Sequence, residues 1–140
     1  MTNHRTLAGL SLTLACTGAM ASGPSDTAFA KALGVPSLSH TAETQTKAGM
    51  TFSDRKYRDA KNEVVVILRL ATPDQFDLWK QAAGAGAVPV SGLGSDAFGY
   101  KGMFGATCAR NAARAACVMP TSGKKFTEAQ VREAVKVALE

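Results

Sequence analysis

The sequence is poor in the residues from which many enzymes build reactive sites. Of its 140 residues only two are histidine, three are cysteine and 6% are aromatic. Since His4 lies in the N-terminal segment discussed below, a Ser-His-Asp or Cys-His site would depend on His40 alone. His40 lies in a polar stretch, where a solvated loop histidine is the simpler interpretation, and a zinc site would lack ligands. We therefore predict a non-enzymatic protein with no catalytic residues, no metal and no cofactor.

No apolar run after position 21 is long enough to span a bilayer. Residues 1–21 resemble a secretory signal, with a basic start and a short uncharged core over residues 7–15. Ala19-Met20-Ala21 has small residues at the two positions that a signal peptidase reads, which predicts cleavage before Ser22. The competing interpretation is lipidation, because Leu14-Ala15-Cys16 is a permissive lipoprotein box that would make Cys16 the acylated first residue. Both interpretations predict a secreted or periplasmic protein, and the second adds a lipid anchor at the envelope.

Charge is present but mild, with 19% charged residues and a net charge of +5. Ordinary solubility explains this balance, and we predict no nucleic-acid partner. The hydrophobic content of 46% and the length fit one globular domain over residues 22–140 with a modest core. Two cysteines, Cys108 and Cys117, remain in that domain. An even pair in an exported domain predicts one disulfide.

The most strongly apolar segment of the domain is the β-branched run Glu63–Ala71. As a strand, its even-numbered residues from 64 to 70 share a wholly apolar face. Val65 and Ile67 lie on the other face, between Glu63 and Arg69. A strand that is apolar on one whole face and half of the other is covered on both sides. We therefore predict that this segment is the central strand of a sheet.

Three helices are predicted over residues 25–36, 72–84 and 127–138, because each has a capping residue followed by a helical stripe of apolar side chains. The second and third also have the glutamine that completes a capping box. The capping residues and box partners, in chain order, are Ser25, Thr72 with Gln75, and Thr127 with Gln130.

Further strands are predicted at residues 49–53 and 97–101. The polar residues 37–47 are interpreted as a loop, and residues 54–62 as a solvated connection to the central strand. Small turn residues around Leu93 predict a tight loop held by one buried side chain.

Residues 106–118 are ambiguous, because six of these 13 residues are alanine, which favours a helix. A helix would separate Cys108 from Cys117 by about 13.5 Å, whereas a disulfide requires Cα atoms within about 7 Å. A hairpin with its turn near residues 111–114 places them opposite each other. We therefore predict strands near residues 104–110 and 114–119. The whole domain is predicted to be α+β, an antiparallel sheet of about five strands with helices packed against it.

Two segments carry a resemblance to a known family. Residues 29–36 and residues 90–98 are similar to the corresponding parts of an uncharacterised family of small exported bacterial proteins and lipoproteins, some appended to receptor kinases as sensor-like domains. Ser95 is inserted relative to the family's spacing, and the resemblance spans nearly all of the domain. It implies a PsbP-like α/β sandwich without established catalytic residues. The family's usual disulfide has no counterpart near Gly23 and Met50, so Cys108–Cys117 would replace it.

Other reactive patterns have ordinary explanations. Asp74 and Asp77 lie in the first turn of a predicted helix, where the helix dipole favours carboxylates. The glycines at 84–86 and 92–94 lack the strand–loop–helix setting of a phosphate loop. Basic residues around Tyr57, and two arginines at the predicted hairpin, are candidates for binding a partner, although a solvated surface is the default interpretation. These candidate residues are Arg55, Lys56, Tyr57, Arg58, Arg110 and Arg114.

The resulting functional prediction is an exported binding domain. Its partner would be an unidentified envelope protein or an anionic polymer, and it would meet the membrane only through a possible lipid anchor at Cys16. Two alternatives stay open. One is an inhibitor of an envelope hydrolase that presents the hairpin between Cys108 and Cys117, and the other is a structural lipoprotein.

Overall fold

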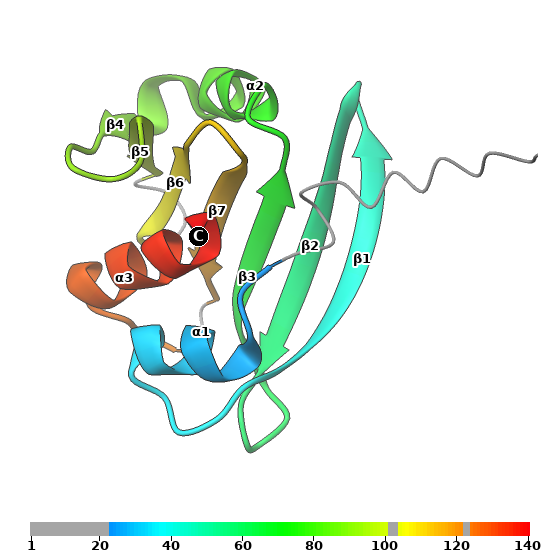
Figure 1. The fold of residues 1–140 in the computed structure, drawn as a ribbon, viewed down its shortest axis with the longest axis vertical. Helices are drawn as coiled ribbons and strands as arrows, with labels where there is room; N and C mark the ends of the chain where they lie inside the picture. Colours follow the sequence, from blue (N-terminus) through cyan, green and yellow to red (C-terminus); the bar gives the residue numbers. More distant parts are fainter. Residues whose placement is uncertain (1–22, 101–103, 122–123) are drawn as a thin grey trace, which may run out of the picture.

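The computed structural model describes residues 23–100, 104–121 and 124–140. In these ranges the chain forms an α+β domain with one antiparallel sheet of seven strands, in the order β1-β2-β3-β7-β6-β5-β4, and three α-helices. Figure 1 shows α1 and α3 against one face of the sheet and α2 at its upper end. The elements are α1 (Asp26–Leu33), β1 (Ser39–Lys47), β2 (Met50–Arg58), β3 (Val64–Ala71), α2 (Gln75–Ala83), the 3-10 turn η1 (Gly84–Gly86), β4 (Ala87–Pro89), β5 (Asp96–Tyr100), β6 (Ala106–Arg110), β7 (Ala115–Pro120) and α3 (Glu128–Leu139).

The predicted central strand is confirmed. β3 pairs antiparallel with β2 on one side and with β7 on the other. Val66, Leu68 and Leu70 are fully buried in the cluster beneath α1 and α3. Val65 departs from the predicted alternation. Tyr57 pairs with Val66 and Arg58 pairs with Val64, so Val65 is the extra residue at a register shift between β2 and β3. Val65 is therefore buried in the same cluster.

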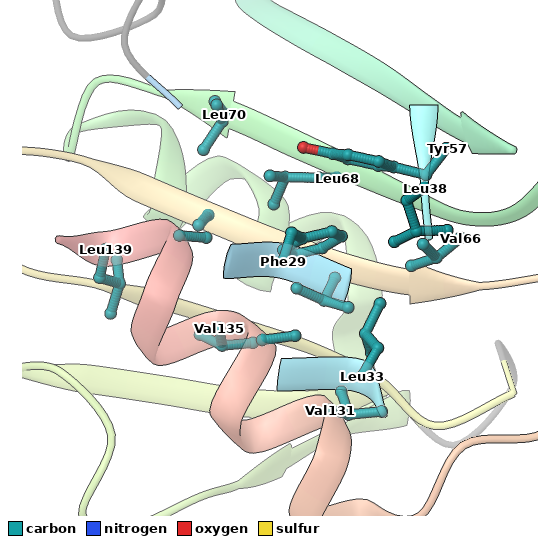
Figure 2. Packing of buried hydrophobic residues seen from close by; sticks show 14 of the residues in the cluster. Phe29, Leu33, Leu38, Tyr57, Val66, Leu68, Leu70, Val131, Val135 and Leu139 are labelled. Carbon is teal, nitrogen blue, oxygen red and sulfur yellow. The ribbon is translucent and has the colours of Figure 1, made fainter. Parts of the chain in front are cut away.

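Helices α1 and α3 cover the first face of the sheet, and both begin at the predicted capping residues. The Ser25 side chain accepts a hydrogen bond from the Ala28 amide, and Thr127 with Gln130 forms a full capping box. Figure 2 shows Phe29 and Leu33 of α1 next to Val131 and Val135 of α3, with β3 residues beyond them. Burying these side chains is the main source of stability on this face.

The second sheet face carries a smaller cluster built around α2. Phe76 and Trp79 of α2 are buried against Phe98 of β5 and the two cysteines. The ring centroids of Phe76 and Phe98 lie 5.3 Å apart in a tilted arrangement, which is favourable for aromatic pairs. Strand alternation explains the two clusters, since neighbouring residues of β6 and β7 point to opposite faces.

The prediction of about five strands is too low, because β1 and β4 were missed. Residues 37–47, interpreted as a loop, contain β1, and its side chains are mostly exposed. A strand exposed on both faces has no apolar alternation to reveal it, although its three threonines suit a strand. β4 has only three residues and lies at the other edge.

Three boundaries also differ from the predictions. β2 continues to Arg58, so the solvated connection predicted over residues 54–62 is shorter and Asp54 and Arg55 are buried. Asp74, not Thr72, precedes α2, and its side chain makes no capping bond, so the predicted capping box is absent. β6 begins after Phe104, which lies in a turn with φ of 49° and is 68% exposed. The predicted buried side chain Leu93 is confirmed.

Candidate functional site

A hollow of about 260 Å³ lies beneath α2, on the sheet face opposite α1 and α3. Five strands, β2, β3, β5, β6 and β7, supply its floor and sides, and α2 supplies the wall above. Most of the surface that lines it is apolar. The lining residues are Met50, Arg69, Trp79, Ala82, Ala83, Tyr100, Ala106, Cys108, Cys117 and Met119.

The predicted disulfide forms the floor of this hollow. Cys108 of β6 and Cys117 of β7 are direct register partners and are joined by a disulfide, with their Cα atoms 4.0 Å apart. Ala106 lies two residues before Cys108 and therefore on the same face. Half-cystine and alanine side chains are short, so α2 cannot fill the space above them.

Helix α2 is held over the floor by contacts at its first turn. The Arg110 guanidinium lies 4.9 Å from the centroid of the Phe76 ring, donates a hydrogen bond of 3.1 Å to Asp77 and lies 3.7 Å from Asp96. These contacts leave Trp79 and Ala83, further along the helix, to line the hollow. Within the described ranges, the buried indole nitrogen of Trp79 has no hydrogen-bond partner.

At the rim of the hollow, Arg69 forms an ion pair with Asp54. Arg69 donates from Nε and Nη2 to the two carboxylate oxygens of Asp54, at 2.8 and 2.9 Å. Its guanidinium also lies 3.9 Å from the centroid of the Phe52 ring. Bidentate pairing fixes Arg69 in place and largely cancels its charge. The rim therefore does not select strongly for an anion.

The side chains that line the hollow suit an apolar guest. Among the described residues, the lining contains no carboxylate, no histidine and no free thiol. Met50 and Met119 are flexible and polarizable and can adapt to the shape of an apolar guest. Tyr100 borders the hollow and rests against Gly86, where an added Cβ would approach the ring to 2.8 Å.

His40 does not line this hollow and instead contacts residues of α1 and β2. Its Nδ1 contacts the Asp26 carboxylate at the start of α1, and its ring centroid lies 5.2 Å from that of Tyr57. This contact attaches α1 to β1. Of the two acidic residues considered above, Asp77 pairs with Arg110, and hydrogen bonds from Thr72 and Gln75 lower the pKa of Asp74.

The basic residues around Tyr57 do not form one exposed patch. They lie in β2, whose alternation sends Arg55 and Tyr57 to the helix-covered face and Lys56 to the other. Tyr57 is fully buried and Arg55 is 8% exposed, so the prediction of a shared partner-binding surface is wrong for these two residues. Burial raises the pKa of the Tyr57 hydroxyl, while the Arg55 guanidinium acts in the opposite direction. Arg58 donates to the Asn62 carbonyl.

The hairpin arginines are also engaged in the fold. Arg110 is paired with Asp77 and Asp96, and Arg114 is buried with its Nη1 donating to the Ala138 carbonyl at the end of α3. The hairpin turn is attached to α3 as well, because Asn111 donates to the Leu139 carbonyl at 2.8 Å. The predicted lipidation residue, Cys16, lies outside the described residues.

Comparisons with known proteins give no family for this chain: no protein-family model, no curated protein and no solved structure matches it. In the part of the chain that the structure describes, no three histidine, cysteine, aspartate or glutamate side chains gather as a metal site. The helices of residues 23–100, 104–121 and 124–140 are all too short or too polar to cross a bilayer.

The sequence predicts the disulfide floor of the hollow but not the hollow itself. The signal available was the spacing of short side chains, Ala106, Cys108 and Cys117, on one face of the predicted hairpin. What it could not show is that α2 crosses above this face, since helix placement is a tertiary property.

Proposed function

We propose that this protein is an exported, non-enzymatic binding domain that holds a small apolar group in the hollow beneath α2. The observation that carries the proposal is a largely apolar space of about 260 Å³, in whose described lining there is no carboxylate, histidine or free thiol. Pockets for drug-sized ligands span about 300–1,000 Å³, so the guest is a small molecule or one apolar side chain of a peptide.

Export is part of the same proposal. The signal-like segment at residues 1–21 supports it, and so does the Cys108–Cys117 disulfide, because such bonds persist in oxidising compartments. The PsbP-like sandwich implied by the family resemblance also belongs to the proposal, supported by the single antiparallel sheet with helices against it.

The inhibitor alternative has no specific observation in its favour. It requires a rigid exposed loop, whereas the turn between Cys108 and Cys117 is hydrogen-bonded to the end of α3. Arg110 and Arg114, the side chains it would present, are respectively ion-paired and buried. The structural-lipoprotein alternative rests on Cys16 and is tested by incorporation of labelled fatty acid that Cys16→Ser abolishes.

The protein contains one tryptophan, Trp79, and it lines the hollow, so its fluorescence reports on occupancy. We expect the neutral apolar dye N-phenyl-1-naphthylamine to quench Trp79 emission by energy transfer in a saturable titration. Ala83→Leu adds bulk inside the hollow and should weaken dye binding about tenfold, a loss of about 1.4 kcal/mol.

Ala85→Leu is the matched control, because Ala85 is exposed, lies in η1 and does not line the hollow. Equal dye affinity in the two leucine variants, or quenching that never saturates, would contradict the proposed site.

A further inference from the structure

The two edges of the sheet differ in how they are protected. β4, at one edge, has three residues and ends in Pro89, which has no backbone N–H to donate. β1, at the other edge, has nine residues, contains no proline and, within the described part of the chain, is bonded to one neighbouring strand, β2. Figure 1 shows β1 as the outermost strand, beyond the region that α1 and α3 cover. A long edge strand without proline can act as a template for another strand.

The hairpin turn determines which backbone groups of β1 face outward. Lys47 pairs with Met50 across the two-residue turn Ala48-Gly49, whose φ angles are 52° and 76°, as in a type I′ turn. The pair flanking such a turn is hydrogen-bonded, so the odd-numbered residues of β1 bond to β2. The N–H and C=O groups of Ala42, Thr44 and Thr46 therefore point away from the sheet.

The charges of β1 are self-complementary in one antiparallel register. When Gln45 lies opposite Gln45 of a second copy, Thr44 pairs with Thr46 of that copy through outward-facing groups. Glu43 then lies opposite Lys47 of the other copy, and the twofold symmetry repeats this ion pair. A register centred on Glu43 would instead place two carboxylates opposite each other. Both charged side chains are exposed on β1.

We propose that β1 is a homodimerisation edge, at which two copies join antiparallel about Gln45 into one continuous sheet, held in register by two Glu43–Lys47 pairs. The occupant is a second copy of this chain because the strand's own charge pattern complements itself. This interface is separate from the hollow beneath α2 and does not depend on a ligand. Strand pairing buries little apolar area, so the dimer is expected to be weak and concentration-dependent.

The test is sedimentation equilibrium of the purified protein from about 10 μM to about 1 mM, where a weak dimer becomes populated. Glu43→Lys creates two like-charge pairs and should raise the dimer dissociation constant about tenfold, as should Lys47→Glu. The double variant with both substitutions restores each pair with its signs exchanged, and it should recover the original constant.

Glu63→Lys and Lys61→Glu are the matched controls, since they make the same charge changes at exposed positions in the β2–β3 connection. Thermal melts establish that each variant is folded. A chain that stays monomeric throughout the concentration range would overturn the proposal. So would a dimer that the single variants leave unchanged, or one that the double charge exchange fails to restore.

Discussion

Reduction of the Cys108–Cys117 disulfide tests the hairpin, the compartment and the floor of the hollow together. The bond joins the two register partners of β6 and β7, which also pair with β5 and β3 respectively. The folded chain therefore keeps its ladders when the bond is broken. Breaking the bond should lower the free energy of unfolding, because the unfolded chain gains conformational freedom.

The magnitude follows from the length of the closed loop. The two cysteines are nine positions apart, so the bond closes a loop of about ten residues. The chain-entropy relation then gives about 2.7 kcal/mol of stabilisation, near the low end for natural disulfides. For a domain of this size, about 4 °C of melting temperature corresponds to each kcal/mol, which predicts a fall of about 10 °C.

The assay is a pair of thermal melts on oxidised and reduced protein. Cys108 and Cys117 are 6% and 4% exposed, so reductant must be added under denaturing conditions before refolding. Mass spectrometry after alkylation verifies that both thiols are free. A variant with Cys108→Ala and Cys117→Ala should be insensitive to reductant, which separates this bond from any effect at Cys16.

Two results would refute the reasoning. A melting temperature lowered by less than about 2 °C in verified reduced protein would mean that the bond does not restrict the unfolded chain as calculated. Finding both thiols free in protein isolated without reductant would remove the argument for an oxidising compartment.

Two further predictions concern stability. Thr127→Ala should lower the free energy of unfolding by about 1 kcal/mol, because it removes a capping hydrogen bond that is present in α3. Thr72→Ala should lower it clearly less, because α2 has no capping box. Equal losses of unfolding free energy in chemical denaturation would contradict this difference. Burial holds the pKa of Tyr57 above its ordinary value, so stability should fall as pH rises beyond about 10, where unfolded tyrosine ionises first. Between about pH 8 and about pH 11, the unfolding free energy of Tyr57→Phe should fall by less than that of the parent chain. If urea titrations give the two proteins the same pH dependence, ionisation of Tyr57 is not the cause of the loss.

The parts of the fold that could be predicted are those with a strong local pattern. The apolar run of β3, the capping residues Ser25 and Thr127, and the cysteine spacing each depend on residues close together in the chain. The cysteine spacing correctly predicts a hairpin in the alanine-rich segment, because nine positions of helix cannot bring two sulfur atoms together.

The missed parts lack such a pattern. β1 is exposed on both faces, so its strand character comes from pairing with β2 and leaves no apolar period in the sequence. The prediction for Arg55 and Tyr57 failed for a related reason. The basic composition of residues 54–62 predicts a solvated connection, yet the extension of β2 through Arg55 and Tyr57 turns both toward the helices.

The sequence by itself determined which segments are apolar, where two helices begin and that the cysteines must meet across a hairpin, because these properties depend on neighbours in the chain. Only the tertiary structure decided that α2 lies over the disulfide and leaves a hollow, and that β1 forms an open edge. Both depend on distances between segments far apart in the chain, which local periodicity does not encode.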